Sequence, residues 1–350
     1  MSDDIDIRVE GAAGRITLNR PAALNALTYR MCLEIEAALD AWSDDDAVKL
    51  LLIDAVGERA FCAGGDIQEM YDTGTAGDFD YGRRFWADEY RMNAKLFGFP
   101  KPVVTFLQGF TMGGGVGVGC HGSHRIVGDT SQIAMPECGI GLVPDVGGTL
   151  LLARAPGRLG EYLGVTAARM GPGDAIHAEF ADYYVPEAKW DALKAALIES
   201  GDWDAVDRAA ETAPDSPLRD AQPVLDYLFS GETLRDVITD LRHSDSDTAR
   251  QAEKLIARNA PLAMACAIEL VHRARGSDDI LIALRNEYRF TARSMEHGDF
   301  LEGIRAAIID KDRAPKWRHA GPLDVAGVDV ANMLRPLGAD EWKPQGRAEP

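Results

Sequence analysis

The sequence predicts an α/β core that is followed by a helical carboxy-terminal region. Apolar segments of strand length alternate with amphipathic helical segments through the amino-terminal part of the chain, and this alternation is typical of α/β proteins. From about residue 190 onward the strand signal disappears and helical periodicity takes over. The chain has 350 residues, of which 46% are hydrophobic, so it is long and apolar enough to bury a large core.

The amino-terminal elements follow one another closely. Residues 5–20, IDIRVEGAAGRITLNR, alternate between polar and apolar residues as a β-hairpin does, with the turn between Gly11 and Gly14. Residues 27–46 have the apolar spacing of an amphipathic helix, and Thr28 is a suitable residue to cap its amino terminus. Buried strands are then expected at residues 49–57, 102–109 and 124–130.

The carboxy-terminal part is expected to be helical. The periodic segments are residues 189–200, 232–243, 247–259, 262–274 and 278–295. We therefore predict two regions, an α/β core over residues 1–200 and a helical region over residues 201–350. The tail after Trp317 is rich in proline and glycine, which indicates loop structure with one short helix near residues 329–337.

Composition and charge narrow the classes of partner. The net charge of −19 disfavours a nucleic-acid backbone or an anionic membrane as a general partner. The sequence has no run of about 18 apolar residues, and its acidic start lacks the basic and apolar segments of a secretory signal. We therefore expect a cytoplasmic protein that does not insert into membranes.

The cysteines and histidines do not predict a metal site. The five cysteines are odd in number and scattered, and no C-x-x-C pair suggests zinc or redox chemistry. We expect buried thiols, although Cys62 and Cys138 adjoin segments that could build a site, which leaves a reactive thiol open. His121 and His124 lie three residues apart without a third ligand nearby, so we expect them to pack rather than to bind metal.

A glycine-rich stretch, TMGGGVGVGC at residues 111–120, needs a separate explanation. Residues 117–122 match G-x-G-x-x-G, but the preceding strand ends near Gly109 and the helix begins before Gly117, which argues against a dinucleotide fingerprint. A P-loop is excluded because no G-K-[ST] follows. The remaining interpretation is a helix start whose unpaired backbone N–H groups a substrate oxygen can approach closely.

A second segment of the same kind is FCAGGDI at residues 61–67, which follows the strand at 49–57 after a short loop. One backbone N–H from each segment would make an oxyanion hole, in which a single donor is worth about 2.7–4 kcal/mol of transition-state stabilisation. Each segment taken alone is equally compatible with a tight turn between a strand and a helix.

Five segments together resemble the crotonase family, also called the enoyl-CoA hydratase/isomerase family. These segments are ITLNRPAALNALT, FCAGGDI, KPVVTFLQGFTMGGGVGVG, MPECGIGLVPDVGGT and DFLEGIRAAIIDKDRAPKW. The resemblance implies a crotonase-like spiral of β-β-α units that is followed by helices. It also implies a thioester site in which the backbone amides of Gly65 and Gly114 form the oxyanion hole for an acyl-CoA carbonyl.

The acidic residues around that site bear on the reaction. Hydratases of the family use two glutamates, and the resemblance places them at residue 137, which is Glu137, and at residue 117, which is Gly117. Because glycine cannot transfer a proton, hydration by the two-glutamate mechanism is disfavoured. The alternative, an enoyl-CoA hydratase or isomerase in which another residue replaces the missing glutamate, remains open.

MPECGIGLVPDVGG is similar to a branch of the family whose members hydrolyse 3-hydroxyisobutyryl-CoA in valine breakdown. That resemblance implies Glu137 and Asp145 as the catalytic pair and Glu89, in FWADEYRMN, as a substrate-binding residue. It also implies an acyl-CoA partner, with no metal or redox cofactor because CoA arrives as part of the substrate. The acyl chain, the assembly into homo-oligomers, and the role of Glu137 as nucleophile or general base are left open.

Simpler explanations exist for each acidic residue. Glu137 could cap a turn, Asp145 could cap the helix that begins near residue 148, and Glu89 could be an ordinary surface residue of an amphipathic helix. A protein that binds acyl-CoA without catalysis is a further alternative, although binding alone would need only the oxyanion glycines. The burial and partners of these three carboxyl groups distinguish these explanations.

Overall fold

The computed structural model describes residues 3–344 and divides into two compact units. Unit 1 runs through Asp66 and includes Arg91–Ala134 and Arg169–Arg219, whereas unit 2 comprises Ile67–Tyr90, Met135–Ala168 and the chain from Asp220 onward. This interleaved division differs from the single boundary expected near residue 200. The two ends of the expected regions, residues 1–2 and 345–350, lie outside the described residues.

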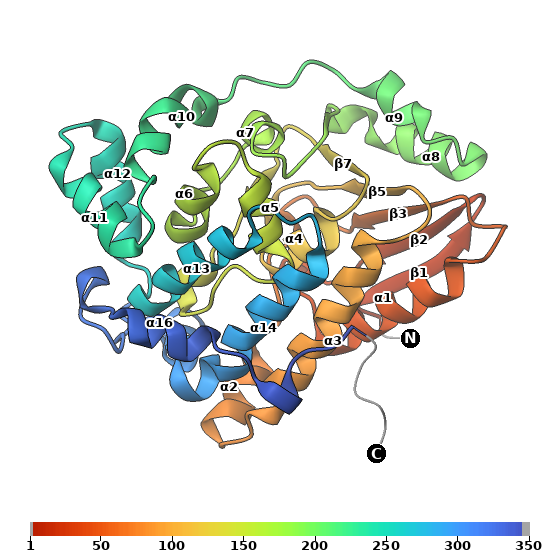
Figure 1. Ribbon diagram of the computed structural model, residues 1–350. Coiled ribbons are helices and arrows are strands. Elements are labelled where there is room, and N and C mark those ends of the chain that lie inside the picture. Colours follow the sequence, from red (N-terminus) through yellow and green to blue (C-terminus); the bar gives the residue numbers. More distant parts are fainter. Residues whose placement is uncertain (1–2, 345–350) are drawn as a thin grey trace. The chain divides into compact units, whose positions relative to one another are not determined.

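Unit 1 contains a six-stranded sheet in the order β1-β2-β3-β5-β7-β9. Figure 1 shows the first five of these strands side by side, in red to yellow. The pair β1–β2 is antiparallel and the remaining neighbours are parallel, so the expected hairpin and buried strands are confirmed. The strands are β1 (Ile5–Glu10), β2 (Ala13–Leu18), β3 (Leu50–Ala55), β5 (Val103–Phe106), β7 (His124–Val127) and β9 (Tyr183–Tyr184).

A second sheet in unit 1 consists of three short parallel strands. These are β4 (Ala60–Cys62), β6 (Phe110–Met112) and β8 (Gln132–Ala134), with β6 in the middle. In parallel neighbours the carboxyl ends of the strands meet at the same edge of the sheet. The glycine segments that follow β4 and β6 therefore leave the sheet at one edge.

The helices of unit 1 begin with α1 (Tyr29–Trp42), whose amino terminus is capped as expected. The Thr28 side chain accepts a hydrogen bond from the Met31 N–H at 3.2 Å. The other helices that lie within unit 1 are α4 (Gly114–Gly119), α7 (Pro172–His177), α8 (Trp190–Ser200) and α9 (Asp204–Ala209).

Helices make up unit 2 among the described residues, and the expected carboxy-terminal helices are confirmed. The helices α5 and α6, from the middle of the chain, pack against the later helix α13, which explains why the division is interleaved (Figure 1). The helices of unit 2 are α2 (Gln68–Thr75), α5 (Gly148–Arg154), α6 (Leu159–Thr166), α11 (Leu234–His243), α12 (Asp247–Ile256), α13 (Pro261–Ala274), α14 (Ile280–His297), α15 (Phe300–Ile304) and α16 (Gly327–Leu334). Two further helices, α3 (Asp80–Phe97) and α10 (Pro217–Leu228), contribute residues to both units.

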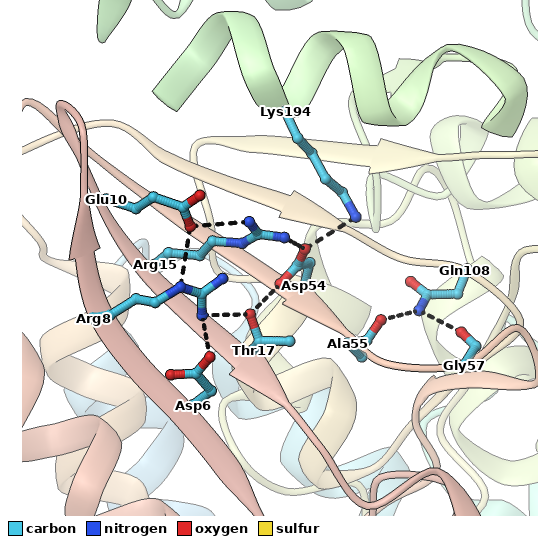
Figure 2. Close-up of polar contacts among 10 residues, drawn as sticks. All are labelled: Asp6, Arg8, Glu10, Arg15, Thr17, Asp54, Ala55, Gly57, Gln108 and Lys194. Carbon is cyan, nitrogen blue, oxygen red and sulfur yellow. Dashed lines mark hydrogen bonds and ion pairs between the residues drawn. The ribbon is translucent and has the colours of Figure 1, made fainter. Parts of the chain in front are cut away.

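A buried ion-pair network connects the sheet of unit 1 to α8 (Figure 2). The Asp54 carboxylate accepts hydrogen bonds from the Arg15 guanidinium and the Thr17 hydroxyl, both at 2.7 Å, and pairs with Lys194 of α8 at 3.0 Å. Burial acts to raise the pKa of Asp54, but Arg15, Lys194 and Thr17 outweigh it and hold the pKa below its ordinary value. A buried carboxyl with cationic partners thus stays ionised in this protein.

The cysteines and histidines pack as the sequence predicts. All five cysteines are buried free thiols. Burial, followed by the charge of Glu137, raises the pKa of Cys138 well above its ordinary value, which disfavours a reactive thiolate there. The His121 ring contacts Phe97 edge-on, and the His124 ring stacks on Tyr183.

Residues 3–344 contain neither a metal-binding cluster nor a single membrane-spanning helix. No group of three or more His, Cys, Asp or Glu side chains in that range has the arrangement to hold a metal ion. No single helix there has the length and apolar composition to cross a membrane, and only α12 and α13 together, joined at a bend of 116°, meet those two criteria.

Candidate active site

The segment after β4 directs the backbone N–H of Gly65 away from Leu27, the residue with which Gly65 pairs. Leu27 forms a parallel bridge with this segment: its N–H donates to the Gly64 carbonyl at 2.9 Å, and its carbonyl accepts from the Asp66 N–H at 2.7 Å. When one residue bonds to both flanking residues in a parallel bridge, the residue between them turns its own N–H to the other side. The Gly65 N–H therefore points away from Leu27 and takes no part in this bridge.

The segment after β6 presents the backbone N–H of Gly114. Gly114 is the first residue of α4, so its N–H has no acceptor in a preceding helical turn. The capping residue Gly113 has φ 51° and ψ −120°, a conformation that residues with a side chain rarely adopt. Glycine at residue 113 thus allows the chain to turn sharply from β6 into the helix.

Main-chain contacts bring the two glycine segments together within unit 1. A Cβ atom added to Gly115 would lie only 2.2 Å from the Cys62 carbonyl oxygen, and one added to Gly64 would lie 3.6 Å from the Met112 carbonyl oxygen. Glycine at residue 115 is therefore required for the close approach of β4 to α4. This packing explains why the run contains glycine at residue 115. It also places the segments that carry the two predicted oxyanion donors, Gly65 and Gly114, next to each other.

In unit 2 the predicted catalytic residue Glu137 is buried at the start of a 3₁₀ turn, Glu137–Ile140. Within residues 3–344 its Oε2 atom has no hydrogen-bond partner. Burial raises the pKa of Glu137 well above its ordinary value, and the nearby Asp145 charge raises it further. These properties do not suit a residue that serves only to cap a turn, because a capping carboxylate gains from ionisation and from its hydrogen bonds.

Asp145 is also buried, and its Oδ2 atom accepts a hydrogen bond from the Tyr90 hydroxyl at 2.8 Å. Burial raises the pKa of Asp145 to about 7, although the Tyr90 hydrogen bond opposes that shift. The explanation of Asp145 as a side-chain cap of α5 is wrong. The capping residue is Gly147, and Asp145 accepts from the Gly148 N–H through its backbone carbonyl, at 2.7 Å.

Glu89 lies on α3 and is only 3% exposed, so the surface explanation for this residue is wrong as well. Burial raises its pKa well above the ordinary value, and the charge of Asp145 adds to the shift. Glu89, Glu137 and Asp145 thus influence one another electrostatically within unit 2.

Two residues of this region were not identified from the sequence. Tyr90 is the partner of Asp145, and Glu287 of α14 is a fourth buried carboxyl, whose pKa burial raises to about 8. A signal for Glu287 was present, since it occupies the buried face of α14 in register with Leu284 and Thr291. A glutamate at an apolar helix position is uncommon unless it has a specific partner.

The carboxyl cluster, defined as Glu89, Glu137, Asp145 and Glu287, differs electrostatically from Asp54. The pKa of Asp54 is lowered by cationic partners, whereas the pKa of every cluster member is raised by burial. Carboxyl groups whose pKa values move toward neutrality suit proton transfer at physiological pH. Because the members are coupled, their protons are expected to titrate as a group.

The raised pKa of Asp145 predicts how stability depends on pH. The unfolded value for aspartate is about 3.9, so the folded protein holds this proton more tightly and loses stability as pH rises from about 4 to 7. Asp145→Asn removes that loss, because asparagine stays neutral and its amide oxygen can still accept from Tyr90. We expect the melting temperature of Asp145→Asn to exceed that of the wild type at pH 8.

Calorimetry at several pH values between 4 and 8 measures this difference. It should shrink as the pH falls toward 4, because the unfolded Asp145 then begins to bind the proton that the folded protein already holds. An Asp145→Asn protein that melts below the wild type throughout this range would contradict the assigned shift.

The family model for enoyl-CoA hydratase/isomerase matches residues 13–334 of the chain. Among curated proteins, the chain is 36% identical over 345 residues to the mitochondrial 3-hydroxyisobutyryl-CoA hydrolase of Rattus norvegicus, covering 95% of this chain and 89% of the relative. It is 34% identical over 355 residues to the protein of the same name from Gallus gallus, covering 97% and 91%.

Two solved structures share nearly the whole fold. One is described as an enoyl-CoA hydratase from Rhodobacter sphaeroides 2.4.1, with a TM-score of 0.94, 56% identity, and coverage of 97% of this chain and 99% of the other. The second is described as a carnitinyl-CoA dehydratase from Mycobacterium thermoresistibile, with a TM-score of 0.93, 42% identity, and coverage of 99% and 100%. The resemblance found in the sequence motifs and the predicted fold class are confirmed: this chain belongs to the enoyl-CoA hydratase/isomerase family, the crotonase family.

Proposed function

We propose that this chain is an acyl-CoA thioester hydrolase that converts 3-hydroxyisobutyryl-CoA and water into 3-hydroxyisobutyrate and CoA, a reaction of valine breakdown. The observation that carries the proposal is the identity of residue 117. Gly117 is buried within α4, where the two-glutamate hydratases have an acid, and it has no side chain that could transfer a proton. The names of the curated relatives support the same activity.

The proposed mechanism assigns thioester activation to the backbone. The N–H groups of Gly65 and Gly114 hold the thioester oxygen and stabilise the negative charge that develops there when the carbonyl carbon is attacked. Each N–H is presented by a glycine segment whose own hydrogen bonds leave it unused for the sheet or the helix ladder. No metal or redox cofactor takes part in the proposal, since CoA enters with the substrate.

Glu137 is the proposed catalytic carboxylate. As a general base it takes a proton from water while the water oxygen forms a bond to the carbonyl carbon; as a nucleophile its own oxygen forms that bond, giving an acyl-enzyme anhydride that water then cleaves. In either route the C–S bond breaks and the electrons leave with the CoA sulfur. The unpartnered Oε2 atom of Glu137 supports both routes, because no hydrogen bond has to be broken to free it.

Asp145 is proposed to deliver a proton to the departing CoA sulfur or to orient the substrate hydroxyl. A pKa of about 7 leaves a substantial protonated fraction at neutral pH, as a general acid requires. Glu89 is proposed to bind the polar end of the acyl group, because burial with a raised pKa leaves its carboxyl able to donate as well as accept a hydrogen bond.

A competing function is suggested by the two solved structures, which are described as a hydratase and a dehydratase. Hydration of an enoyl-CoA would require another residue to replace the acid absent at position 117. Assembly into homo-oligomers and a cytoplasmic location remain predictions from the sequence.

The test compares two substrates in parallel. We expect kcat/KM for thiol release from 3-hydroxyisobutyryl-CoA to exceed kcat/KM for hydration of crotonyl-CoA by at least about 100-fold, which corresponds to roughly 2.7 kcal/mol. Thiol release is followed with a thiol reagent, and hydration by the loss of the enoyl thioester absorbance. Comparable rates would reject the hydrolase assignment, and binding of both substrates without turnover would favour a noncatalytic acyl-CoA-binding protein.

A further inference from the structure

The loop that carries Asp145 contains a strained residue. Val146 has φ 54°, a left-handed conformation that a β-branched side chain strongly disfavours. Residues held in such conformations persist only where the surrounding structure fixes them, and they concentrate at functional sites. Contacts on each side of Val146 therefore hold the chain in this conformation.

On the carboxyl side the chain is held by Glu287, a residue 140 positions away from Gly147 in the sequence. Its Oε2 atom accepts from the Gly147 N–H at 2.8 Å, and its Oε1 atom accepts from the Thr149 N–H at 3.0 Å and from the Thr149 hydroxyl. Gly147 has no side chain with which to cap α5, so a glutamate from α14 supplies the acceptors instead.

On the amino side the chain is held by Tyr90. Its hydroxyl lies 2.8 Å from the Asp145 carboxylate and 3.4 Å from the Thr291 hydroxyl. Its ring packs edge-on against Tyr288 and Trp342, at centroid distances of 6.3 and 6.4 Å, which restrict its rotation.

The hydrogen bonds of Glu287 and the contact between Tyr90 and Thr291 both involve one face of α14. Glu287 and Thr291 are four residues apart on this helix, so their side chains are neighbours on the same face. Glu287 accepts a hydrogen bond from Gly147, which directly follows Val146. Thr291 contacts Tyr90, and Tyr90 bonds to Asp145, which directly precedes Val146. Asp145 is thus fixed from both sides of the strained residue by hydrogen bonds to other parts of the chain.

We propose that Glu287 and Tyr90 are positioning residues that hold the Asp145 carboxyl in the orientation needed for its proton-transfer role, an inference that rests on the proposed function. Glu287 fixes the backbone that carries Asp145, and Tyr90 fixes the carboxyl itself. A simpler explanation gives Glu287 only the role of capping α5. That role would affect stability but would not couple Glu287 to Asp145 in catalysis.

Glu287→Gln tests the hydrogen bonds from Gly147 and Thr149 to Glu287 with little change in side-chain shape. Glutamine offers one acceptor oxygen where glutamate offers two, so the N–H of either Gly147 or Thr149 loses its acceptor and faces an amide donor instead. We expect kcat for thioester hydrolysis to fall about 10-fold while KM changes less than about three-fold, because the fault lies in orientation and not in substrate binding.

A double-mutant cycle with Asp145→Asn separates positioning from capping. If Glu287 acts through Asp145, Glu287→Gln should have almost no further effect on kcat in the Asp145→Asn background. The matched control is Glu161→Gln, which alters another buried carboxyl of unit 2 that is bonded to Arg158, His272 and Arg275. Glu161→Gln should lower the melting temperature but leave kcat in the folded enzyme unchanged.

Tyr90→Phe tests the hydrogen bond from Tyr90 to Asp145 through titration. Loss of the hydroxyl removes the hydrogen bond that lowers the pKa of Asp145, so that pKa should rise by about one unit. The charge of Asp145 raises the pKa values of Glu89 of α3, Glu137 and Glu287, and all three of these carboxyl groups stay unchanged in this variant. Tyr288→Phe is the control, because its hydroxyl donates to the Arg83 carbonyl.

Infrared difference spectroscopy measures that titration without turnover, on protein with ¹³C-labelled aspartate carboxyl groups and with Asp145→Asn to identify the band. An upward shift in Tyr90→Phe, with none in Tyr288→Phe, together with a non-additive kcat cycle, supports the inference. An additive cycle or an unshifted band overturns it while leaving hydrolysis by the wild type intact. Absence of hydrolysis in the wild type instead rejects the proposed function.

If Glu287→Gln does not fold, Thr149→Ala is the alternative variant, because it removes only the hydroxyl that donates to Glu287. It should give a smaller loss of kcat that is equally non-additive with Asp145→Asn.

Discussion

Glu137→Gln is expected to lower kcat for thioester hydrolysis by about 10²–10⁴ if the carboxylate is a general base, and by more if it is the nucleophile. Glutamine keeps the shape of the side chain but cannot accept the proton of water or form an anhydride. Substrate binding should persist, since the oxyanion donors are unchanged. Single-turnover measurements separate the chemical step from binding.

The folded state of this variant should be at least as stable as the wild type above neutral pH. Burial raises the pKa of Glu137, so the folded protein is destabilised as that carboxyl ionises, and glutamine removes this effect. A loss of activity accompanied by a higher melting temperature would show that the carboxylate is retained for chemistry. Near-normal turnover by folded Glu137→Gln would overturn its catalytic assignment.

Single-turnover hydrolysis of the wild type in ¹⁸O water distinguishes the two routes. Label in the Glu137 carboxylate, found by mass analysis of its peptide, establishes the anhydride route. Label confined to the product acid supports attack by water.

Gly114→Pro is expected to reduce kcat by about 10²–10³, the loss of about 2.7–4 kcal/mol that follows removal of one oxyanion donor. Proline has no N–H, and the first position of a helix is the place where proline is best tolerated. The variant therefore removes the donor without removing a hydrogen bond within α4.

Gly114→Ala is the matched control, because alanine adds a side chain at the same position and keeps the N–H. Activity in Gly114→Ala together with a loss in folded Gly114→Pro isolates the contribution of the hydrogen bond. Equal losses in both variants would assign the effect to the side chain, and normal activity in Gly114→Pro would show that the oxyanion donor lies elsewhere. Circular dichroism and melting temperatures establish that each variant is folded.

Local patterns predicted much of the fold and part of the candidate site. The hairpin, the parallel strands, the Thr28 cap and the carboxy-terminal helices follow from residue periodicity and capping preferences, which act over a few neighbouring residues. The motif around Glu137 predicted a carboxyl that the structure does bury. Its catalytic role stays a prediction.

The parts that the sequence did not predict depend on contacts between distant segments. The Tyr90 hydroxyl meets Asp145 across 55 residues, and Glu287 meets Gly147 across 140, so no local pattern reveals either pair. Asp145 looked suited to cap α5 because the sequence gives no sign that Glu287 takes that role. The left-handed conformation of Val146 was equally hidden, since valine normally disfavours it.

The contact between Gly115 and the Cys62 carbonyl has a consequence for how this family member can diverge. A side chain at residue 115 would place its Cβ atom 2.2 Å from the Cys62 carbonyl oxygen. Every amino acid except glycine carries that atom, so no substitution at position 115 avoids the clash unless β4 and α4 move apart. We therefore expect position 115 to remain glycine while other positions of the chain diverge.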